Sequence, residues 1–582
     1  MGRERRAALL PTAVATFALM AGIAVGLGPG TPASAQSTAR PNFIVVMTDD
    51  QTLEAMRVLP QTQALIGDAG ATFEQFFVSF PLCCPSRASF LTGQYPHNNR
   101  VLENYPPAGG FQALDSTETL PVWLNRSGYY TALIGKLMNG YNSSPVGVPP
   151  GWSEWHGEKT ENRYYGYGLL ESEGLVTYGD PEEDFTDPAD PAAYSTDNYT
   201  AKAVDFIQRR AVAPEPFFLW LSYNAPHSGA PEPPPEVESR CRGNAKPAER
   251  HLSAFENEPL PVPLSLNEID VSDKPPSLRN TPPLTPQELA EVRNIYTCEL
   301  ASLQAVDEGV SDIVETLSAT GALANTYVIF TSDNGFFHGE HRIIFGKNRF
   351  YEEATHVPLL IRGPGIEPGS TVKELSANVD LAPTILDAAD AAAAIPRDGR
   401  SLLPTIAQPE LRLGREILFD TNTYKAIRNP RYVYAEHFAR RDRGARELYD
   451  LAVDPFQLVN LHRDSEYRRV RNALADRLER LRRCDAEECR SRPRLKLKRT
   501  GEGGCRRNFV SVVIAGNDGE SLTRARFVAG TRYLRSDRRE PFEAQLPTRR
   551  IDGAKVEVRV VLEDGREAVF GRKLCPSDAE TG

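Results

Sequence analysis

Short runs of apolar residues recur along the chain, and most of them stop abruptly at polar or reactive residues. Continuous apolar runs of this length are typical of β-strands that are buried on both faces, as in a parallel sheet. The clearest runs cover residues 43–47, 130–134, 217–221, 327–332 and 357–361. The polar residues that follow four of them are Thr48-Asp49-Asp50, Gly135-Lys136, His227 after a short connection, and Asp333-Asn334-Gly335.

Helical segments lie between these runs. The clearest begins after Thr285, a residue suited to an N-cap, and has Pro286 in its first turn. Its apolar residues recur at three- and four-residue spacing as far as Leu317, and Gly321 ends it. The alternation of strands and helices predicts a doubly wound α/β fold with a mostly parallel sheet. Since ligands bind beyond the carboxyl ends of the strands in such sheets, we expect the polar residues to meet there.

The acidic and amide residues at two of these strand ends predict a metal site. Asp49, Asp50, Asp333 and Asn334 all offer hard oxygen ligands, which suit Ca²⁺ or Mg²⁺ better than zinc. Adjacent residues of a regular strand point to opposite faces, so both members of each pair reach one ion only if the strand has already ended. The alternative is that both pairs are ordinary loop and turn residues.

A second candidate functional segment is Cys83-Cys84-Pro85-Ser86-Arg87. Pro85 suits the first turn of a helix, and Gly93 suits its end. Cys83 would then lie just before a helix N-terminus, where free N–H groups favour an anion. Arg87 adds a permanent forked charge that suits a sulfate or phosphate. The alternative is a buried structural pair of cysteines before a helix.

Charge and targeting signals narrow the class of protein. The net charge of −11 argues against general nucleic-acid binding. Residues 1–35 have the pattern of a signal peptide: arginines at the start, an apolar stretch over residues 13–27, and a small-residue cleavage site at Ala33-Ser34-Ala35. The apolar stretch is shorter than the roughly 20 residues of a membrane span. We therefore expect cleavage near Ala35, export, and no stable membrane anchor.

Eight cysteines in an exported chain suggest disulfides. With Cys83 and Cys84 set aside, six remain. Cys484 and Cys489 would close a small loop, Cys505 and Cys575 bracket the last part of the chain, and Cys241 with Cys298 is the third pair. This connectivity is a hypothesis, because spacing alone does not prove it.

The pattern changes toward the C-terminus. Residues 467–483 have the periodicity of an amphipathic helix, with Leu474 and Leu478 on its apolar face. From about Gly503, strand-like runs at 509–514, 525–528 and 556–561 alternate with turn signals. They predict an appended all-β domain, similar to a β-sandwich, over residues 503–580.

Together these motifs resemble the sulfatase family of the alkaline-phosphatase-like superfamily, over most of the chain after the signal peptide. The subgroup that the chain resembles most is the N-acetylglucosamine-6-sulfatases. The motifs that carry this are residues 83–87, Gly135-Lys136, Pro149-Pro150-Gly151-Trp152, residues 270–275 and residues 357–365. The resemblance implies a sulfatase domain over 36–495, in which about 415–495 form a subdomain with a small antiparallel sheet.

The resemblance also implies roles for individual residues. Cys83 would be converted after translation to formylglycine by a formylglycine-generating enzyme, and would be both nucleophile and metal neighbour. A divalent cation, Ca²⁺ in preference to Mg²⁺, would be held by Asp49, Asp50, Asp333 and Asn334. The remaining catalytic candidates would hold the nucleophile, the sulfate or the leaving oxygen: Arg87, Lys136, His227, Lys347 and, as the weakest of them, His341.

The implied chemistry depends on an aldehyde hydrate. One hydroxyl attacks sulfur and releases the sugar or aryl oxygen, and the second hydroxyl then loses its proton so that sulfate leaves. Many arylsulfatases have a histidine for this proton two residues after the lysine of the Gly-Lys motif. In this chain that position is Met138. The sequence therefore does not identify the group that accepts this proton. The glucosamine-sulfatase subgroup shows a similar non-histidine pattern, so Met138 agrees with the resemblance to that subgroup.

These observations predict a secreted sulfatase that acts on N-acetylglucosamine-6-sulfate or related sulfated glycans. One alternative is a phosphodiesterase or phosphonate hydrolase that uses the same modified site. Another is a non-catalytic protein that binds sulfated glycans and keeps Cys83 unmodified.

Overall fold

The computed structural model describes residues 40–490, except 142–146, 161, 173, 180–191, 230–239 and 242, together with the C-terminal strands given below. Its largest sheet has ten strands in the order β11-β2-β10-β9-β1-β8-β4-β5-β6-β7. The parallel centre consists of β9 (Thr326–Ser332), β1 (Asn42–Asp49), β8 (Phe217–Pro226), β4 (Tyr130–Gly135) and β5 (Glu154–Glu158). The outer strands are β11 (Ser370–Val372), β2 (Ala71–Phe73), β10 (Leu359–Arg362), β6 (Tyr167–Glu171) and β7 (Gly174–Tyr178).

The five predicted strands all lie in this sheet, and the predicted mostly parallel α/β fold is confirmed. The run at 357–361 corresponds to β10, which pairs antiparallel with both β9 and β2. Residues of β1 alternate between the two faces of the sheet. Phe43 and Val45 belong to one apolar core, and Ile44 and Val46 to the other. This burial on both faces explains why the strand is apolar without interruption.

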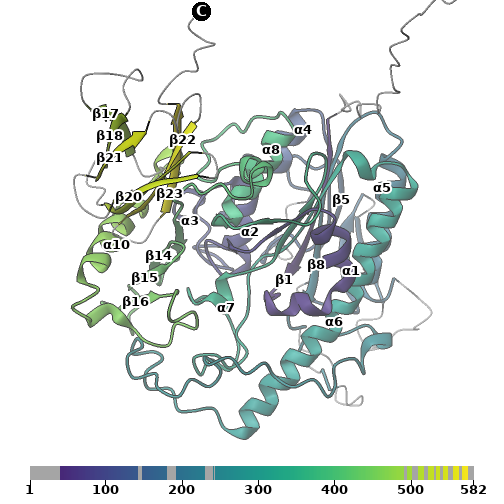
Figure 1. Ribbon diagram of the computed structural model, residues 1–582. Coiled ribbons are helices and arrows are strands. Elements are labelled where there is room, and N and C mark those ends of the chain that lie inside the picture. The colour runs from purple at the N-terminus through teal and green to yellow at the C-terminus, as the bar shows by residue number, and fades with distance from the viewer. Residues whose placement is uncertain are drawn as a thin grey trace, which may run out of the picture. The chain divides into compact units, whose positions relative to one another are not determined.

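Helices cover both faces of the sheet (Figure 1). On one face lie α5 (Ser195–Arg210) and α6 (Pro286–Ala319), and on the other lie α2 (Cys83–Thr92), α4 (Leu120–Arg126) and α8 (Leu381–Ala388). The predicted long helix is α6: Thr285 is its N-cap and forms a capping box with Glu288. The shorter helices are α1 (Pro60–Thr62), α3 (Pro96–Asn99), α7 (Glu352–Thr355) and α9 (Leu403–Ala407).

A small antiparallel sheet follows, as the resemblance implied. Its strands are β13 (Ile417–Asp420), β14 (Tyr424–Arg428), β15 (Tyr432–His437) and β16 (Arg446–Asp450). The predicted amphipathic helix is α10 (Arg468–Leu481), which buries Leu474, Leu478 and Leu481 in a core shared with this sheet.

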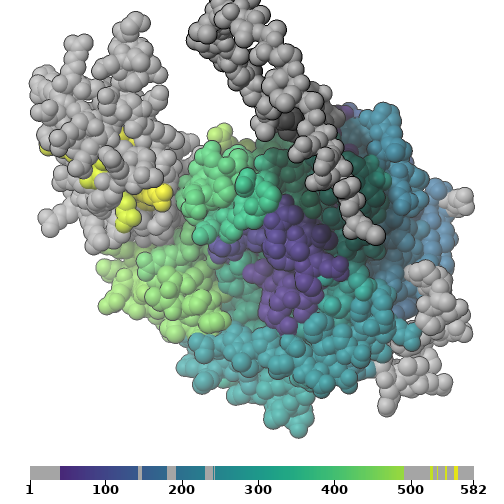
Figure 2. Space-filling view, turned by 45° about the vertical axis from the view of Figure 1, so that its right-hand side comes forward, coloured from purple at the N-terminus to yellow at the C-terminus, as the bar shows by residue number. Residues whose placement is uncertain are grey.

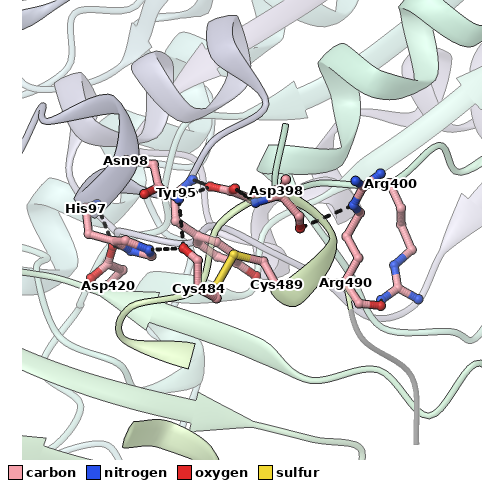
Figure 3. The surroundings of a disulfide bond; sticks show 10 residues. Tyr95, His97, Asn98, Asp398, Arg400, Asp420, Cys484, Cys489 and Arg490 are labelled. Atoms are coloured by element: carbon pink, nitrogen blue, oxygen red, sulfur yellow. Dashed lines mark hydrogen bonds and ion pairs between the residues drawn. A yellow bond between two sulfur atoms is a disulfide. The ribbon is translucent and has the colours of Figure 1, made fainter. Parts of the chain in front are cut away.

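Two of the three hypothetical disulfides are present, Cys241–Cys298 and Cys484–Cys489. The second lies beside α3, where His97 contacts both Asp420 and the backbone oxygen of Cys484 (Figure 3). Asp398 accepts hydrogen bonds from the backbone of Tyr95 and of Ala486. These contacts join the end of the subdomain to the segment that follows α2. Cys505 and Cys575 lie outside the described residues.

The C-terminal strands form two antiparallel sheets, β17-β18-β21 and β20-β19-β22-β23. This agrees with the predicted all-β character, although pairing begins with β17, before residue 503. The strands are β17 (Leu495–Thr500), β18 (Phe509–Gly516), β19 (Leu522–Ala529), β20 (Arg532–Asp537), β21 (Phe542–Pro547), β22 (Lys555–Leu562) and β23 (Glu567–Lys573).

Segments far apart in the sequence meet in the sheet. On the face seen in Figure 2, purple residues from the first part of the chain lie between teal and green ones, in keeping with the pairing of β2 with β10 and β11. The predicted signal peptide lies outside the described residues. Among the residues that are described, no helix combines the length and apolar character needed to cross a membrane.

Candidate active site

Two central strands end at the residues that the sequence singled out. β1 ends at Asp49, and Asp50 adopts a left-handed conformation with φ of 69°. β9 ends at Ser332, immediately before Asp333. The alternation of side chains therefore stops where each pair begins, and all four side chains can turn to one place. A left-handed aspartate carries backbone strain, and such strain is concentrated at functional sites.

Asp49, Asp50 and Asp333, with Asn334, form what we call the acidic cluster. One carboxylate oxygen from each of its three aspartates lies within 4.8 Å of the other two, and all four side chains are buried. The amide nitrogen of Asn334 donates to Asp50, whereas its oxygen is buried and has no hydrogen-bond partner among the described residues. A buried oxygen without a partner and three converging carboxylates are the donor set that a hard divalent cation requires.

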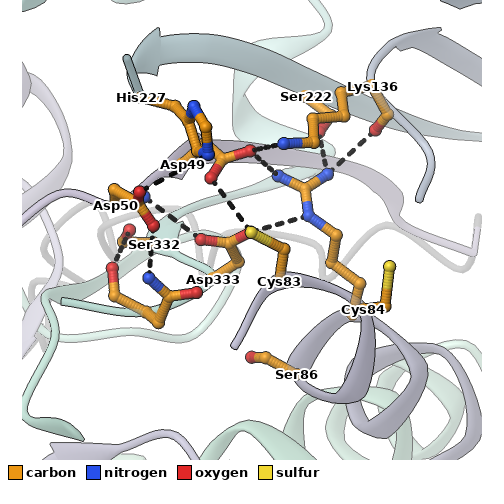
Figure 4. Close-up of polar contacts among 12 residues, drawn as sticks. Asp49, Asp50, Cys83, Cys84, Ser86, Lys136, Ser222, His227, Ser332 and Asp333 are labelled. Atoms are coloured by element: carbon orange, nitrogen blue, oxygen red, sulfur yellow. Dashed lines mark hydrogen bonds and ion pairs between the residues drawn. The ribbon is translucent and has the colours of Figure 1, made fainter. Parts of the chain in front are cut away.

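The sulfur of Cys83 faces the acidic cluster (Figure 4). Cys83 is the first residue of α2, so the helix begins two residues before Pro85, and Gly93 ends it with φ of 68°. The sulfur lies 3.5 Å from a carboxylate oxygen of Asp49 and 3.0 Å from the ammonium of Lys347. The geometry thus joins the cysteine, a helix N-terminus, a cation and the acidic cluster in one buried place.

Arg87 lies one turn further along α2 and binds two carboxylates of the acidic cluster. Its Nε donates to Asp333 at 2.7 Å and its Nη2 to Asp49 at 3.1 Å. Its Nη1 donates to the backbone oxygen of Lys136 at 2.9 Å and to the hydroxyl of Ser222 at 2.8 Å. Because the side chain is fully buried, this fork fixes the positions of two members of the acidic cluster.

Lys136 follows the end of β4 and contacts the same carboxylate oxygen of Asp49 as Arg87. Its ammonium contacts Asp49 and donates to the side-chain oxygen of Asn162 at 3.0 Å. Gly135, which precedes it, has φ of 97°, and a Cβ at this position would come within 2.1 Å of the backbone oxygen of Ser222. Only glycine can make this turn, which aims Lys136 at the cluster.

Lys347 and His227 flank Asp50. The ammonium of Lys347 contacts Asp50 as well as the Cys83 sulfur. The ring of His227 lies with Nε2 3.7 Å from a carboxylate oxygen of Asp50 and with Nδ1 2.7 Å from the backbone oxygen of Ser228. Burial lowers the pKa of His227, which favours a neutral ring that donates from Nδ1.

Burial and charge set the pKa values at this site. Burial alone would raise the pKa of Asp49, but Lys136 and the other nearby cations hold it below its ordinary value. Burial and the charge of Asp49 raise the pKa of Asp333. Burial, followed by Asp49, also raises the pKa of the Cys83 thiol. An unmodified Cys83 would therefore be a protonated thiol and a weak nucleophile.

His341 lies elsewhere. Its Nδ1 is 2.6 Å from a carboxylate oxygen of Glu268, its Nε2 is 3.7 Å from Glu353, and its ring stacks on Tyr351. Among the described residues, no hydrogen bond or ion pair joins it to Cys83 or to the acidic cluster. The structure therefore brings Cys83, Arg87, Lys136, His227 and Lys347 together with the cluster, and places His341 in a separate buried ion pair.

Sequence reasoning missed two residues that support the site. Ser222 binds Arg87, and Asn162 binds Lys136. A lone serine within an apolar strand and an asparagine in an irregular loop carry no motif, so neither could be found without the three-dimensional arrangement. Met138 is buried within an apolar core, in agreement with its apolar side chain.

Comparisons with known proteins agree over most of the chain. A family model described as sulfatase matches residues 41–391, and one described as N-sulphoglucosamine sulphohydrolase, C-terminal, matches residues 339–484. The N-acetylglucosamine-6-sulfatase of Capra hircus is 32% identical over 511 residues, which cover 79% of this chain and 87% of that protein.

Solved structures show the same fold. The structure of BT4656 in complex with its substrate D-glucosamine-2-N,6-O-disulfate has a TM-score of 0.61 and 25% identity, and the match covers 78% of this chain and 98% of that one. A phosphonate monoester hydrolase of Agrobacterium radiobacter has a TM-score of 0.57 and 21% identity over 76% of this chain and 95% of that one. The second likeness concerns the fold alone.

Proposed function

Since this chain belongs to the sulfatase family and is a sulfuric ester hydrolase, we propose that it acts through a formylglycine made from Cys83 on the 6-sulfate of N-acetylglucosamine or of a related glycan. The observation that carries this proposal is the position of the Cys83 sulfur, at the first residue of α2, 3.5 Å from Asp49 and 3.0 Å from Lys347. This position is where a nucleophile would be needed, and the thiol itself is poorly suited to the task.

A divalent cation would be held by Asp49, Asp50, Asp333 and Asn334, with calcium favoured because every ligand is a hard oxygen. The unpartnered oxygen of Asn334 supports this assignment. When bound, the cation would supply positive charge beside the sulfate oxygens. Arg87 would keep two of the carboxylates in place through its bonds to Asp49 and Asp333.

The remaining side chains would each contact a different part of the sulfate ester. Formylglycine, when present, supplies a hydrated aldehyde with two hydroxyl groups. One hydroxyl would attack sulfur, and the second would lose its proton so that sulfate leaves. Lys136 and Lys347 would stabilise the negative charge that spreads over the oxygens during transfer. His227, neutral and hydrogen-bonded through Nδ1, would be placed to assist the departing sugar oxygen.

The choice of an amino sugar rests on relatives. The goat protein is named for N-acetylglucosamine 6-sulfate, and BT4656 was solved with a 6-O-sulfated glucosamine. Secretion is supported by the N-terminal pattern of residues 1–35 and by the two disulfides, which form in oxidising compartments. A formylglycine-generating enzyme would be the partner during maturation.

Paired assays test this function. The protein, purified from cells that modify Cys83, would be assayed on N-acetylglucosamine 6-sulfate and on the matching 6-phosphate and phosphonate esters. We expect release of sulfate, loss of that activity in Cys83→Ala, and full activity in Cys84→Ala, a matched control at the neighbouring buried cysteine. Faster turnover of the phosphate or phosphonate esters would contradict the substrate assignment, and an active Cys83→Ala would contradict the mechanism.

A further inference from the structure

The turn between β15 and β16 carries a group of exposed arginines. Arg440, Arg441 and Arg443 lie within four successive residues of this turn, and all three are exposed to solvent. Among the described residues, no carboxylate forms an ion pair with any of them, whereas the nearby Arg446 pairs with Glu436. Three permanent positive charges are therefore grouped on the surface of a chain whose net charge is −11.

The turn is held in place by the fold, so the three arginines have a fixed base. Asp442, between them in the sequence, is buried and accepts a hydrogen bond from the backbone N–H of Ser277 at 2.7 Å. The backbone N–H of Gly444 donates to the oxygen of His437 at 3.0 Å and closes the turn. Asp442 is the one acidic residue in the sequence of this turn, and its side chain is directed inward. The outward surface of the turn therefore carries positive charge.

Hydrogen bonds connect this turn to the active site. The hydroxyl of Ser277 accepts a hydrogen bond from Nη2 of Arg349 at 3.2 Å. Arg349 lies two residues after Lys347, whose ammonium is 3.0 Å from the Cys83 sulfur. The small antiparallel sheet lies beside this segment (Figure 1), and Phe350 packs in the core of that sheet. Cationic side chains thus lead from the reacting position to the turn.

Arg349 is itself able to bind a ligand. It is half-buried, and among the described residues the only hydrogen bond of its guanidinium is the one to Ser277. The N–H donors of an arginine form a fork that suits the oxygens of a sulfate or a carboxylate. The remaining donors of Arg349 are therefore open to an anionic group. We call this residue and the three arginines of the turn the basic rim (Arg349, Arg440, Arg441 and Arg443).

We propose that the basic rim binds a second oxyanion, a sulfate or a carboxylate, on a sugar further along the glycan chain whose 6-sulfate lies at position 83. Arg349 contacts the sugar next to the reacting one, and the arginines of the turn contact anionic groups beyond it. The preferred substrate is then a chain of sulfated or acidic sugars rather than a single sulfated sugar. This inference rests on the proposed function and adds the substrate class.

The physical basis is charge complementarity. Grouped like charges repel one another, and an anionic chain placed across them removes this repulsion while it gains forked hydrogen bonds. Neutral sugars have no charge to offer to the same surface. Because the arginines of the turn are exposed, each contact contributes little by itself, and its strength falls as the ionic strength rises. The rim therefore selects charged oligosaccharides through the sum of several weak contacts.

A kinetic test compares two double variants that remove the same charge. The rim variant is Arg441→Gln/Arg443→Gln. The control variant is Arg126→Gln/Arg209→Gln, at two exposed arginines near the ends of α4 and α5 that precede β4 and β8, at the opposite edge of the sheet from the site. The parent should have a higher kcat/KM for a sulfated tetrasaccharide than for N-acetylglucosamine 6-sulfate. We expect this preference to fall about tenfold in the rim variant, mainly through KM, and to persist in the control variant.

Two further substrates and the ionic strength show what the rim recognises. A tetrasaccharide that carries carboxylates in place of its additional sulfates identifies the preferred oxyanion. One without further charges should be turned over no better than the monosaccharide. Added salt should lower the kcat/KM of the parent more for the charged tetrasaccharide than for the monosaccharide, because exposed charges are screened. This difference should shrink in the rim variant.

Binding can also be measured without turnover. The probe is a sulfated tetrasaccharide whose terminal sugar lacks the 6-sulfate, so it has no group to place at position 83. Isothermal titration calorimetry should show binding to the parent that weakens about tenfold in the rim variant. Because no sulfate is released, this result does not depend on the chemistry at Cys83.

The inference fails if the rim variant keeps the preference of the parent for the sulfated tetrasaccharide, or if it loses activity equally on both substrates. It also fails if the neutral tetrasaccharide is preferred as strongly as the charged one. Cys83→Ala separates this inference from the proposed function. An active Cys83→Ala rejects the chemistry at Cys83, whereas unchanged binding of the probe in the rim variant rejects the basic rim alone.

Discussion

The ammonium of Lys347 lies 3.0 Å from the sulfur of Cys83 and at the same time contacts the carboxylate of Asp50. One cation therefore joins the position of the nucleophile to the acidic cluster. Burial would lower the pKa of Lys347, but Asp50 and the other surrounding anions raise it well above its ordinary value. Lys347 is accordingly a permanent positive charge at the place where sulfate oxygens would be held.

Lys347→Met should lower kcat by about 10²–10³-fold, because one donor to the developing charge is lost from a site that excludes water. Steady-state assays with the sulfate ester measure this. Lys373→Met, at an exposed lysine, is the control and should keep full activity. A Lys347→Met enzyme with unchanged kcat would show that this cation serves the fold only.

Asp50→Asn should weaken calcium binding by about tenfold or more, because one of the three charged ligands of the acidic cluster becomes neutral. Asparagine tolerates the left-handed conformation of residue 50, so the fold should survive. Isothermal titration calorimetry and the rise of Tm with added calcium both report the affinity. The exposed Asp68→Asn should behave as the parent does, and equal affinity in Asp50→Asn would remove Asp50 from the site.

Arg87→Met should lower the free energy of unfolding by about 3–5 kcal/mol, because Asp49 and Asp333 would remain buried without their cation. Saturating calcium should restore part of this loss, since the metal would neutralise the same carboxylates. Thermal unfolding with calcium and with a chelator measures both effects. Arg126→Met, at an exposed arginine, serves as the control. A loss that calcium does not reduce would argue against a shared metal site.

His341→Gln should destabilise the protein in a pH-dependent way. Burial would lower the pKa of His341, but the hydrogen bond to Glu268 and the nearby carboxylate of Glu353 together outweigh burial and raise the pKa to about 9, above the ordinary value of 6.5. The stability that these two carboxylates contribute through His341, about 3 kcal/mol, is fully present below pH 6.5 and is lost as the pH rises through 9. The difference in Tm between parent and variant should therefore shrink between pH 6 and pH 10.

Glu268→Gln should show a smaller pH dependence of the same sign, because it removes one of the two carboxylates that raise the pKa of His341. If the substitution of His341 instead abolished turnover while leaving Tm unchanged at every pH, His341 would belong to the catalytic machinery rather than to the fold.

Much of the fold was predictable because its determinants are local. The apolar run of β1 is buried on both faces, and the capping box of α6 involves residues three positions apart. The acidic cluster was also predictable, because two strand ends of a parallel sheet must lie at the same edge.

The parts of the fold and site that could not be predicted depend on contacts between residues far apart in the sequence. Nothing in the sequence distinguishes Ser222 on β8 from any other serine, and its hydrogen bond to Arg87 joins residues 135 positions apart. His341 shows the opposite case: a histidine close in sequence to Asp333 is directed to Glu268 by its left-handed backbone. Long-range packing decides both outcomes.

The central claim is that Cys83 is the precursor of the nucleophile. It is tested most directly by mass spectrometry of the peptide that contains Cys83, from active protein isolated from the cells that naturally produce it. We predict an aldehyde at position 83, trapped by a hydrazide reagent, in an amount that matches the fraction of active enzyme. An intact thiol at position 83 in fully active protein would contradict the account.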